Sequence, residues 1–181
     1  MDELKTYCDF VNNLKEGEHI YHKVYHDHHY GFMIDDDNEL FGRLILEINQ
    51  AGLSWTTILK KEDNFRRAYD NFNINKIANY SIVDIERLMQ DAGIIRNKLK
   101  ILATISNAQI LIVLQKQFGS FKAWLEHYAP QSKQDWVKLF KKTFKFTGGE
   151  IVGEFLMSIG FLPGAHVEKC PIFRLTHSKA V

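Results

Sequence analysis

The sequence predicts an all-α fold, because apolar residues recur at helical spacing along almost the whole chain. Proline occurs only at positions 130, 163 and 171, so the first 129 residues contain no residue of this helix-breaking type. The chain has 181 residues, of which 45% are hydrophobic, and this suits one domain with one core. We therefore expect a single all-helical domain over residues 1–181.

The first clear helix is expected to begin at the acidic run 35–37, because carboxylates stabilise a helix N-terminus. Its apolar residues fall on one face: Leu40, Phe41, Leu44, Ile45 and Ile48. Ser54 is suited to cap a second helix. Apolar residues follow Ser54 at compatible spacings: Trp55, Ile58, Leu59, Phe65, Ala68, Tyr69 and Phe72.

Ser81 with Asp84 resembles a capping box and begins a short helix, which ends at Gly93. A long helix with a basic start is expected from about Arg96. Its side chains available to the core are Leu99, Leu102, Ile105, Ile112 and Val113.

Ser120 and Ser132 are expected to begin two more helices. A last helix runs from about Gly149 to a terminating Gly160, because apolar residues again recur at helical spacing between them. Only the segment 21–32, which is dense in His and Tyr, is not expected to be helical.

The charge and hydropathy of the chain exclude several classes of protein. The net charge is +1, so binding to nucleic acid would need a local basic patch. No run of eighteen apolar residues occurs, and the first residues lack an apolar run of secretory length. We expect a soluble, cytoplasmic protein without membrane association. Nothing resembles a coiled-coil seam, so a monomer is expected.

The only two cysteines, Cys8 and Cys170, lie near opposite ends of the chain. Cys8 is followed by His26, and His166 precedes Cys170 by four residues, so the four side chains form a possible Cys₂His₂ zinc set. Four protein ligands leave no position for water, which is typical of structural Zn²⁺. Such an ion would tie the two ends of the chain together. The alternative is two buried or oxidisable cysteines with surface histidines.

Glu47 lies on the apolar side of the first expected helix, so its carboxyl is expected to be at least partly buried. Such a group is paired, protonated or reserved for a ligand. Tyr21, Tyr25 and Tyr30 precede it and Trp55 follows it, which is enough to line a pocket for a planar ligand. The alternatives are a structural partner for Glu47, such as a buried arginine, and plain core positions for the aromatic residues.

The segment 90–100 joins a glycine turn to a basic helix start. Gly93, Arg96, Lys98 and Lys100 would present backbone amides and positive charge together, which suits the phosphate backbone of DNA. A DNA-anchoring hairpin at Gly93, Arg96 and Lys98 is one interpretation. An ordinary helix connection with a solvated basic face is the other.

Several segments together resemble the DNA-3-methyladenine glycosylase I family. They are Tyr-His-Asp-His-His-Tyr-Gly at 25–31, Glu-Ile-Asn-Gln-Ala-Gly-Leu-Ser-Trp-Thr-Thr-Ile-Leu-Lys-Lys at 47–61, Asp-Ala-Gly-Ile-Ile-Arg at 91–96, Phe-Lys-Phe-Thr-Gly at 144–148 and the His166/Cys170 pair. The resemblance implies a helix-hairpin-helix DNA glycosylase fold. It also implies base-excision repair of alkylated double-stranded DNA, by hydrolysis of the N-glycosidic bond of 3-methyladenine.

The resemblance further implies roles for single residues. Cys8, His26, His166 and Cys170 would be the ligands of the structural zinc. Glu47 would be the catalytic carboxylate of the pocket and would recognise the base. Tyr25 and Trp55 would lie on the two faces of the base, and Tyr30 would stack nearby.

Methylation at N3 makes the base cationic. An anionic Glu47 would therefore bind it more strongly than adenine through charge-assisted hydrogen bonds. The aromatic rings would also bind it more strongly, through cation–π attraction. No lysine is nominated for a Schiff base, so we expect a monofunctional enzyme that does not cut the strand.

The chain departs from the family pattern at His29 and Tyr30, where many members have Glu and Trp. A damage-binding module that does not cleave is therefore an alternative. A zinc hydrolase of a small substrate is another, although a closed four-ligand set and the lack of a His-Glu-x-x-His helix argue against it.

Overall fold

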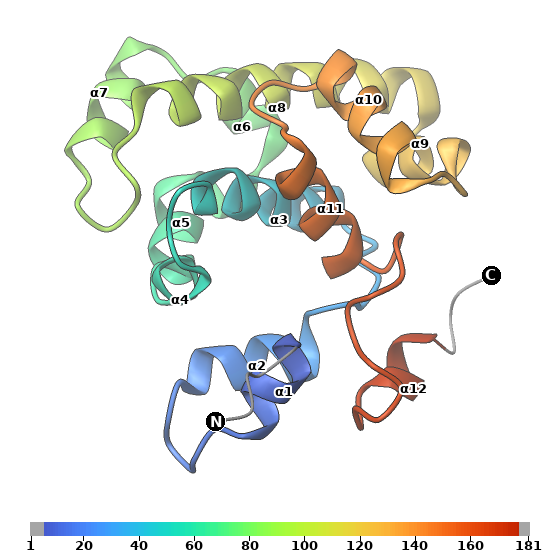
Figure 1. Ribbon diagram of the computed structural model, residues 1–181. Helices are drawn as coiled ribbons and strands as arrows, with labels where there is room; N and C mark the ends of the chain where they lie inside the picture. Colours follow the sequence, from blue (N-terminus) through green and yellow to red (C-terminus); the bar gives the residue numbers. More distant parts are fainter. Residues whose placement is uncertain (1–5, 178–181) are drawn as a thin grey trace. The chain divides into compact units, whose positions relative to one another are not determined.

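The computed structural model describes residues 6–177, and every regular element in that range is helical, as predicted (Figure 1). The elements are α1 (Tyr7–Asn12), α2 (Ile20–His28), α3 (Asp37–Gln50), α4 (Trp55–Leu59), α5 (Glu62–Ala68), the 3₁₀ turn η1 (Asp70–Phe72), α6 (Ile74–Ala78), α7 (Ile82–Gln90), α8 (Lys98–Phe118), α9 (Phe121–Tyr128), α10 (Lys133–Thr143), α11 (Gly149–Ser158) and α12 (Phe173–His177).

The chain divides into two compact units, and the second is an insertion within the first. One unit comprises Met1–Met33 and Leu156–Val181, and the other comprises Ile34–Phe155. The expectation of a single domain stays a prediction.

Helix α3 is the central element of the unit Ile34–Phe155, where it packs against α4, α5, α6, α8 and α9. The Asp36 side chain accepts a hydrogen bond from Glu39 N at 2.9 Å, which confirms that the acidic run begins this helix. The predicted apolar face is fully buried. Gly42 allows a close approach within this core, because a Cβ atom there would overlap the ring of Phe72.

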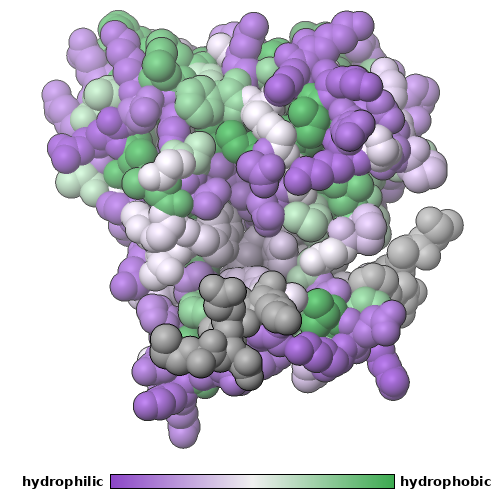
Figure 2. All heavy atoms as spheres, viewed as in Figure 1, coloured by the Kyte–Doolittle hydropathy of each residue, from purple (hydrophilic) through white to green (hydrophobic). Residues whose placement is uncertain are grey.

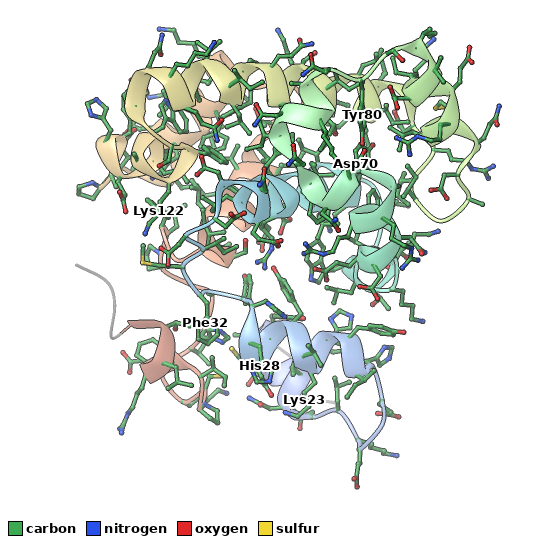
Figure 3. All side chains as sticks on the ribbon, turned by 180° about the vertical axis from the view of Figure 1, so that it is seen from behind. Lys23, His28, Phe32, Asp70, Tyr80 and Lys122 are labelled. Atoms are coloured by element: carbon green, nitrogen blue, oxygen red, sulfur yellow. The ribbon has the colours of Figure 1, made fainter. Side chains whose placement is uncertain are left out.

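The second predicted helix begins at the expected cap, since Ser54 Oγ accepts from Thr57 N. It is not continuous to Phe72, however. It divides into α4, α5 and η1. The α-helical conformation ends before residues 70–72, because these adopt left-handed φ angles of 50°, 55° and 58°. Tyr80 donates a hydrogen bond to Asp70 at 2.6 Å across this bend, and Figure 3 labels both side chains.

Helices α7 and α8 begin as the sequence indicates, but the buried face of α8 differs from the predicted one. The capping box of Ser81 and Asp84 is present. In α8, Leu99, Leu102 and Val113 are 68%, 38% and 50% exposed, so their assignment to the core was wrong. The buried face contains polar residues, which a search for apolar periodicity does not count: Lys100, Thr104 and Asn107 alongside Ile101, Ile105, Ala108 and Leu111.

Ser120 and Ser132 cap α9 and α10, as predicted. These helices contribute a group of buried aromatic side chains: Phe121, Trp124, Trp136 and Phe140. Asp37 connects the start of α3 to α9, because its carboxylate accepts from Phe121 N at 2.7 Å and Lys122 N at 3.2 Å. An ion pair of 2.5 Å between Lys122, which Figure 3 labels, and Asp35 supports the same junction.

The other unit contains α1, α2 and α12. The expectation that segment 21–32 would not be helical was wrong, because α2 spans Ile20–His28. Its inner face consists of His22, Tyr25 and His26, which are buried at spacings of three and four residues. His22 Nδ1 lies 2.9 Å from the hydroxyl of Tyr7 on α1, so a polar contact stabilises this helix where the sequence offered few apolar residues.

Helix α11 ends at Ser158, two residues before the predicted terminator Gly160, whose φ of 77° favours glycine. Within the described part of the chain, no helix combines the length and apolar character that a membrane crossing requires. On the face seen in Figure 2, hydrophobic side chains are scattered among hydrophilic ones.

Candidate functional site

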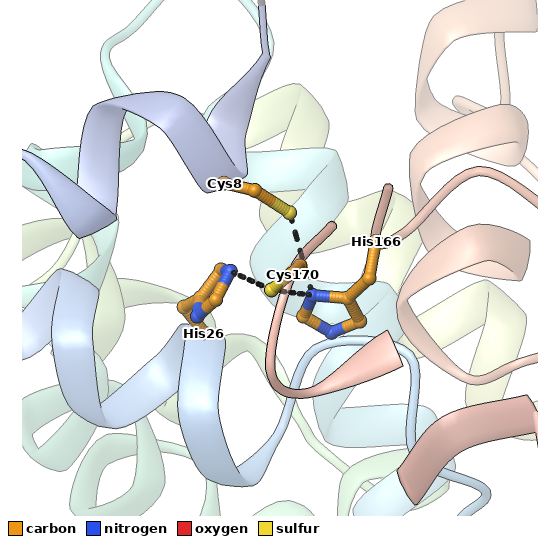
Figure 4. A group of neighbouring side chains, drawn as sticks. All are labelled: Cys8, His26, His166 and Cys170. Carbon is orange, nitrogen blue, oxygen red and sulfur yellow. Dashed lines mark hydrogen bonds between the residues drawn. The ribbon is translucent and has the colours of Figure 1, made fainter. Parts of the chain in front are cut away.

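Two cysteines and two histidines meet in the unit that contains both ends of the chain (Figure 4). Their ligand atoms all lie within 4.8 Å of one another, and all four residues are buried. Cys8 Sγ is 3.6 Å from His166 Nδ1, and Cys170 Sγ is 3.6 Å from His26 Nε2 and 3.7 Å from His166 Nδ1. The structure thus brings together all the metal ligands predicted from the sequence.

Three parts of the chain present the four ligands. Cys8 lies on α1 and His26 lies on α2. His166 and Cys170 lie in the segment between α11 and α12, where Cys170 N donates to Val167 O at 2.8 Å and closes a turn. This turn allows two residues only four apart to face one point.

Hydrogen bonds outside the cluster fix the orientation of both imidazoles. His26 Nδ1 lies 2.7 Å from a carboxylate oxygen of Asp27, and His166 Nε2 lies 2.7 Å from the carbonyl oxygen of Tyr30. Each outer nitrogen therefore donates a proton, which leaves His26 Nε2 and His166 Nδ1 with lone pairs directed at the cysteines. Asp27 was not predicted to have a role, although a carboxylate next to a ligand histidine is a recognisable signal.

These distances fit a tetrahedral ion. Bonds of about 2.3 Å from zinc to sulfur and about 2.0–2.1 Å to nitrogen separate neighbouring S and N ligands by about 3.6 Å. The three sulfur–nitrogen distances of 3.6, 3.6 and 3.7 Å agree with that value. The residue types, these three distances and the outer hydrogen bonds are compatible with Zn²⁺, and the ligand atoms together lie within 4.8 Å of one another.

Glu47 is buried on α3, with 4% of its surface exposed, as its place on the apolar face predicted. Burial raises the pKa of its carboxyl to about 8, while Arg43 lowers it and Glu154 raises it. Burial thus favours the protonated form of this carboxyl in the free protein, and an anionic Glu47 opposite the methylated base stays a prediction.

Arg43 lies one helical turn before Glu47 and is itself buried, with 8% of its surface exposed. It also lowers the pKa of Glu62, although burial raises that pKa by more. A buried arginine was one of the structural partners considered from the sequence. The i, i+4 spacing between Arg43 and Glu47 is the signal that could have identified which arginine it is. Arg43 offsets only part of the effect of burial on Glu47.

The predicted aromatic residues divide between the two units. Tyr25 and Tyr30 are buried together, with ring centroids 5.6 Å apart. Trp55 begins α4, five residues after the end of α3, and is half-buried. Tyr21 is 49% exposed. The arrangement of Tyr25, Tyr30, Glu47 and Trp55 around one ligand stays a prediction.

The turn before α8 is ordered by side chains. Gly93 N donates to the Asp91 carboxylate at 2.7 Å, and Lys61 Nζ donates to the carbonyl oxygens of Ala92 and Gly93 at 2.9 and 3.2 Å. Arg96 and Lys98 are exposed, as binding to phosphate would need.

Lys100 does not belong to this exposed set. Only 4% of its surface is exposed, so the expectation that it adds to the basic face was wrong.

Comparisons with known proteins give consistent results. The family model "Methyladenine glycosylase" matches residues 15–139. The chain is similar to DNA-3-methyladenine glycosylase of Haemophilus influenzae, at 31% identity over 93% of this chain and 98% of that protein. It is also similar to DNA-3-methyladenine glycosylase 1 of Escherichia coli, at 36% identity over 81% of this chain and 88% of that protein.

One similar solved structure is a variant of 3-methyladenine DNA glycosylase I in complex with 3-methyladenine. The TM-score is 0.80 at 30% sequence identity, over 89% of this chain and 95% of that one.

Proposed function

Since the chain belongs to the methyladenine glycosylase family, we propose that it hydrolyses the N-glycosidic bond of 3-methyladenine in alkylated double-stranded DNA. The observation that carries this proposal is the similarity, over nearly the whole chain, to a DNA-3-methyladenine glycosylase. The buried carboxyl of Glu47 gives the proposal a chemical basis.

Glu47 would select the base by charge. Methylation at N3 makes the base a cation and a good leaving group, so the enzyme has to recognise the base and hold it outside the DNA duplex. A carboxyl with a pKa of about 8 is neutral when alone at pH 7, but a cation at hydrogen-bonding distance favours its ionised form. Neutral adenine would have no such effect, so normal bases lose the charge-assisted hydrogen bond.

The aromatic residues would add to this discrimination. Tyr25 and Trp55 on the two faces of the base, with Tyr30 nearby, would attract a cationic ring more strongly than a neutral one through cation–π interaction. The sugar would pass through an oxocarbenium-like state, with water as nucleophile and without a covalent enzyme intermediate.

The Cys₂His₂ cluster would hold structural Zn²⁺. Four protein ligands leave no open position for water or substrate, so a bound ion would supply stability and no chemical step. By joining α1 and α2 to the segment 166–170, it would fix the part of the chain that carries Tyr25 and Tyr30.

The turn before α8 would contact DNA in the manner of a helix-hairpin-helix motif. Backbone amides near Gly93 and the exposed cations of Arg96 and Lys98 would bind phosphates, which makes affinity fall as salt rises. We propose that the protein acts in the cytoplasm as a monomer.

Release of free bases from methylated duplex DNA, resolved by chromatography, tests this function. Wild type is expected to release 3-methyladenine, and Glu47→Gln to lose at least about 100-fold in rate while it still binds DNA. Glu86→Gln is the matched control, because Glu86 is exposed on α7, and it should act as wild type. Binding without release by wild type would instead indicate a damage-binding module. Strand breakage without an added lyase would contradict a monofunctional enzyme.

A further inference from the structure

Lys100 is a buried cation in the first turn of α8. Only 4% of its surface is exposed, which is unusual for lysine. Burial lowers the pKa of its ammonium group. A lysine in such an environment has either a structural partner or a chemical role.

Its partners are backbone carbonyls at the end of α3. Lys100 Nζ donates to Asn49 O at 2.9 Å and to Ala51 O at 2.8 Å. The last carbonyls of a helix have no partners within the helix and form the negative end of its dipole, so an ammonium group is well suited to them. The same ammonium lies 5.9 Å from the ring centroid of Phe146, within reach of a cation–π contact.

The carbonyl of Ala51 belongs to a tight turn. Leu53 N donates to Gln50 O at 2.7 Å, Ala51 has φ and ψ of −51° and 116°, and Gly52 has φ of 82°. These values describe a type II β-turn. Gly52 and Leu53 are exposed, so the turn is held from its inner side by Lys100.

The position of this turn in the chain gives it its importance. It joins α3, which carries Glu47, to α4, which begins at Trp55. Lys100 itself follows closely after the exposed cations Arg96 and Lys98. One side chain thus connects the start of α8 to the link between two residues of the proposed base pocket.

We propose that Lys100 is a positioning residue, which holds the 50–53 turn so that Glu47 and Trp55 keep the separation that the methylated base requires. The inference rests on the proposed function, because that function makes Glu47 and Trp55 contacts of the methylated base. Lys100 would touch neither the base nor a phosphate. Its two hydrogen bonds and its burial also argue against a role as a nucleophile.

The test compares kcat and KM for release of 3-methyladenine from methylated duplex DNA. Displacement of a group by about 1 Å can cost about 100-fold in rate, so Lys100→Met is expected to lower kcat by about 10- to 100-fold with KM within about 3-fold. Lys100→Arg keeps the charge and two donors, and should recover part of kcat. Lys98→Met should instead raise KM with little change in kcat. Lys116→Met, an exposed substitution at the other end of α8, should change neither.

Hydrogen exchange of the Leu53 amide gives a readout independent of activity. The Leu53 N–H is bonded to Gln50 O, so loss of the Lys100 contacts should speed its exchange by about 10-fold or more in Lys100→Met. If Lys100→Met does not fold, Lys100→Arg is used in its place. The longer side chain and planar guanidinium of arginine should shift the two carbonyls, so kcat should fall by about 3- to 10-fold and the Leu53 amide should exchange faster.

Unchanged kcat per folded molecule with unchanged Leu53 exchange in these variants would overturn the inference. Equal loss of kcat and DNA affinity would also overturn it. A covalent adduct with abasic DNA, trapped by borohydride and lost in Lys100→Met, would replace positioning by a nucleophilic role. If wild type releases no 3-methyladenine, the proposed function fails, and Leu53 exchange still decides whether Lys100 holds the turn.

Discussion

Replacement of Glu47 by glutamine is expected to stabilise the protein, and to do so more as the pH rises. The pKa of this carboxyl rises from 4.5 to about 8 on burial. A carboxyl whose pKa is higher in the folded protein than in the unfolded chain binds its proton more tightly when folded. The free energy of unfolding therefore falls as the pH rises from the pKa of the unfolded chain to the pKa of the folded protein, and is constant above it. For Glu47 this loss falls between pH 4.5 and about 8.

The size of the effect follows from the same two values, which differ by about 3.5. Since a pKa difference of one corresponds to about 1.36 kcal/mol, ionisation of Glu47 costs the folded protein at most about 5 kcal/mol. Glutamine has nearly the same shape and cannot ionise, but burial of its amide costs about 1–3 kcal/mol. We therefore expect Glu47→Gln to raise the free energy of unfolding by on the order of 3 kcal/mol at pH 8.5.

Urea unfolding of the two proteins at pH 5, 7 and 8.5 measures this difference. At pH 5 Glu47→Gln should be as stable as wild type or less stable by up to about 2 kcal/mol, because Glu47 is then protonated in the native protein and the cost of burying the amide remains. Glu86→Gln should match wild type at each pH, since this side chain is exposed. A Glu47→Gln protein that is less stable than wild type at pH 8.5, or a difference independent of pH, would refute the burial argument.

Two further predictions concern the metal cluster and the core. Cys170→Ala should lower the zinc content and reduce the free energy of unfolding by more than about 3 kcal/mol, measured by metal analysis and urea unfolding. Wild-type melting and metal content in this variant would show that the cluster holds no structural ion. Gly42→Ala should destabilise by about 1–3 kcal/mol because its new methyl group overlaps the Phe72 ring. Gly149→Ala is the matched control, since its nearest neighbour is 3.9 Å away; equal stability of the two variants would mean that the core adjusts freely.

Much of the fold could be predicted because capping is local. Asp36, Ser54, Ser81, Ser120 and Ser132 each begin the helix that the sequence indicated. Side-chain capping depends on residues two or three apart, so no knowledge of tertiary contacts is needed.

The failures involve polar residues that tertiary contacts bury. Helix α2 was missed because two of the three residues of its inner face, His22 and His26, are histidines, which do not count as apolar. The face of α8 was misplaced for a similar reason, since Lys100 and Asn107 point inward. Their partners are distant in sequence: Asn49 for Lys100 and Lys145 for Asn107.

In the candidate site, too, some residues could be predicted from the sequence and others could not. Cysteine is rare in this chain, so Cys8 and Cys170 identified the cluster together with two histidines. The carbonyl of Tyr30 that orients His166 belongs to the backbone, and no residue type indicates it. The roles of Glu47 and Trp55 rest on the family resemblance as well as on burial.

The nested order of the two units has a consequence for synthesis on the ribosome. The unit Ile34–Phe155 is continuous in the chain, so it can begin to fold while the rest is still being made. Cys8 and His26 leave the ribosome first, but their partners His166 and Cys170 emerge more than a hundred residues later. Throughout that interval the Cys8 thiol is open to oxidation and both early ligands are open to a competing metal, and the cluster can close only after Cys170 has emerged.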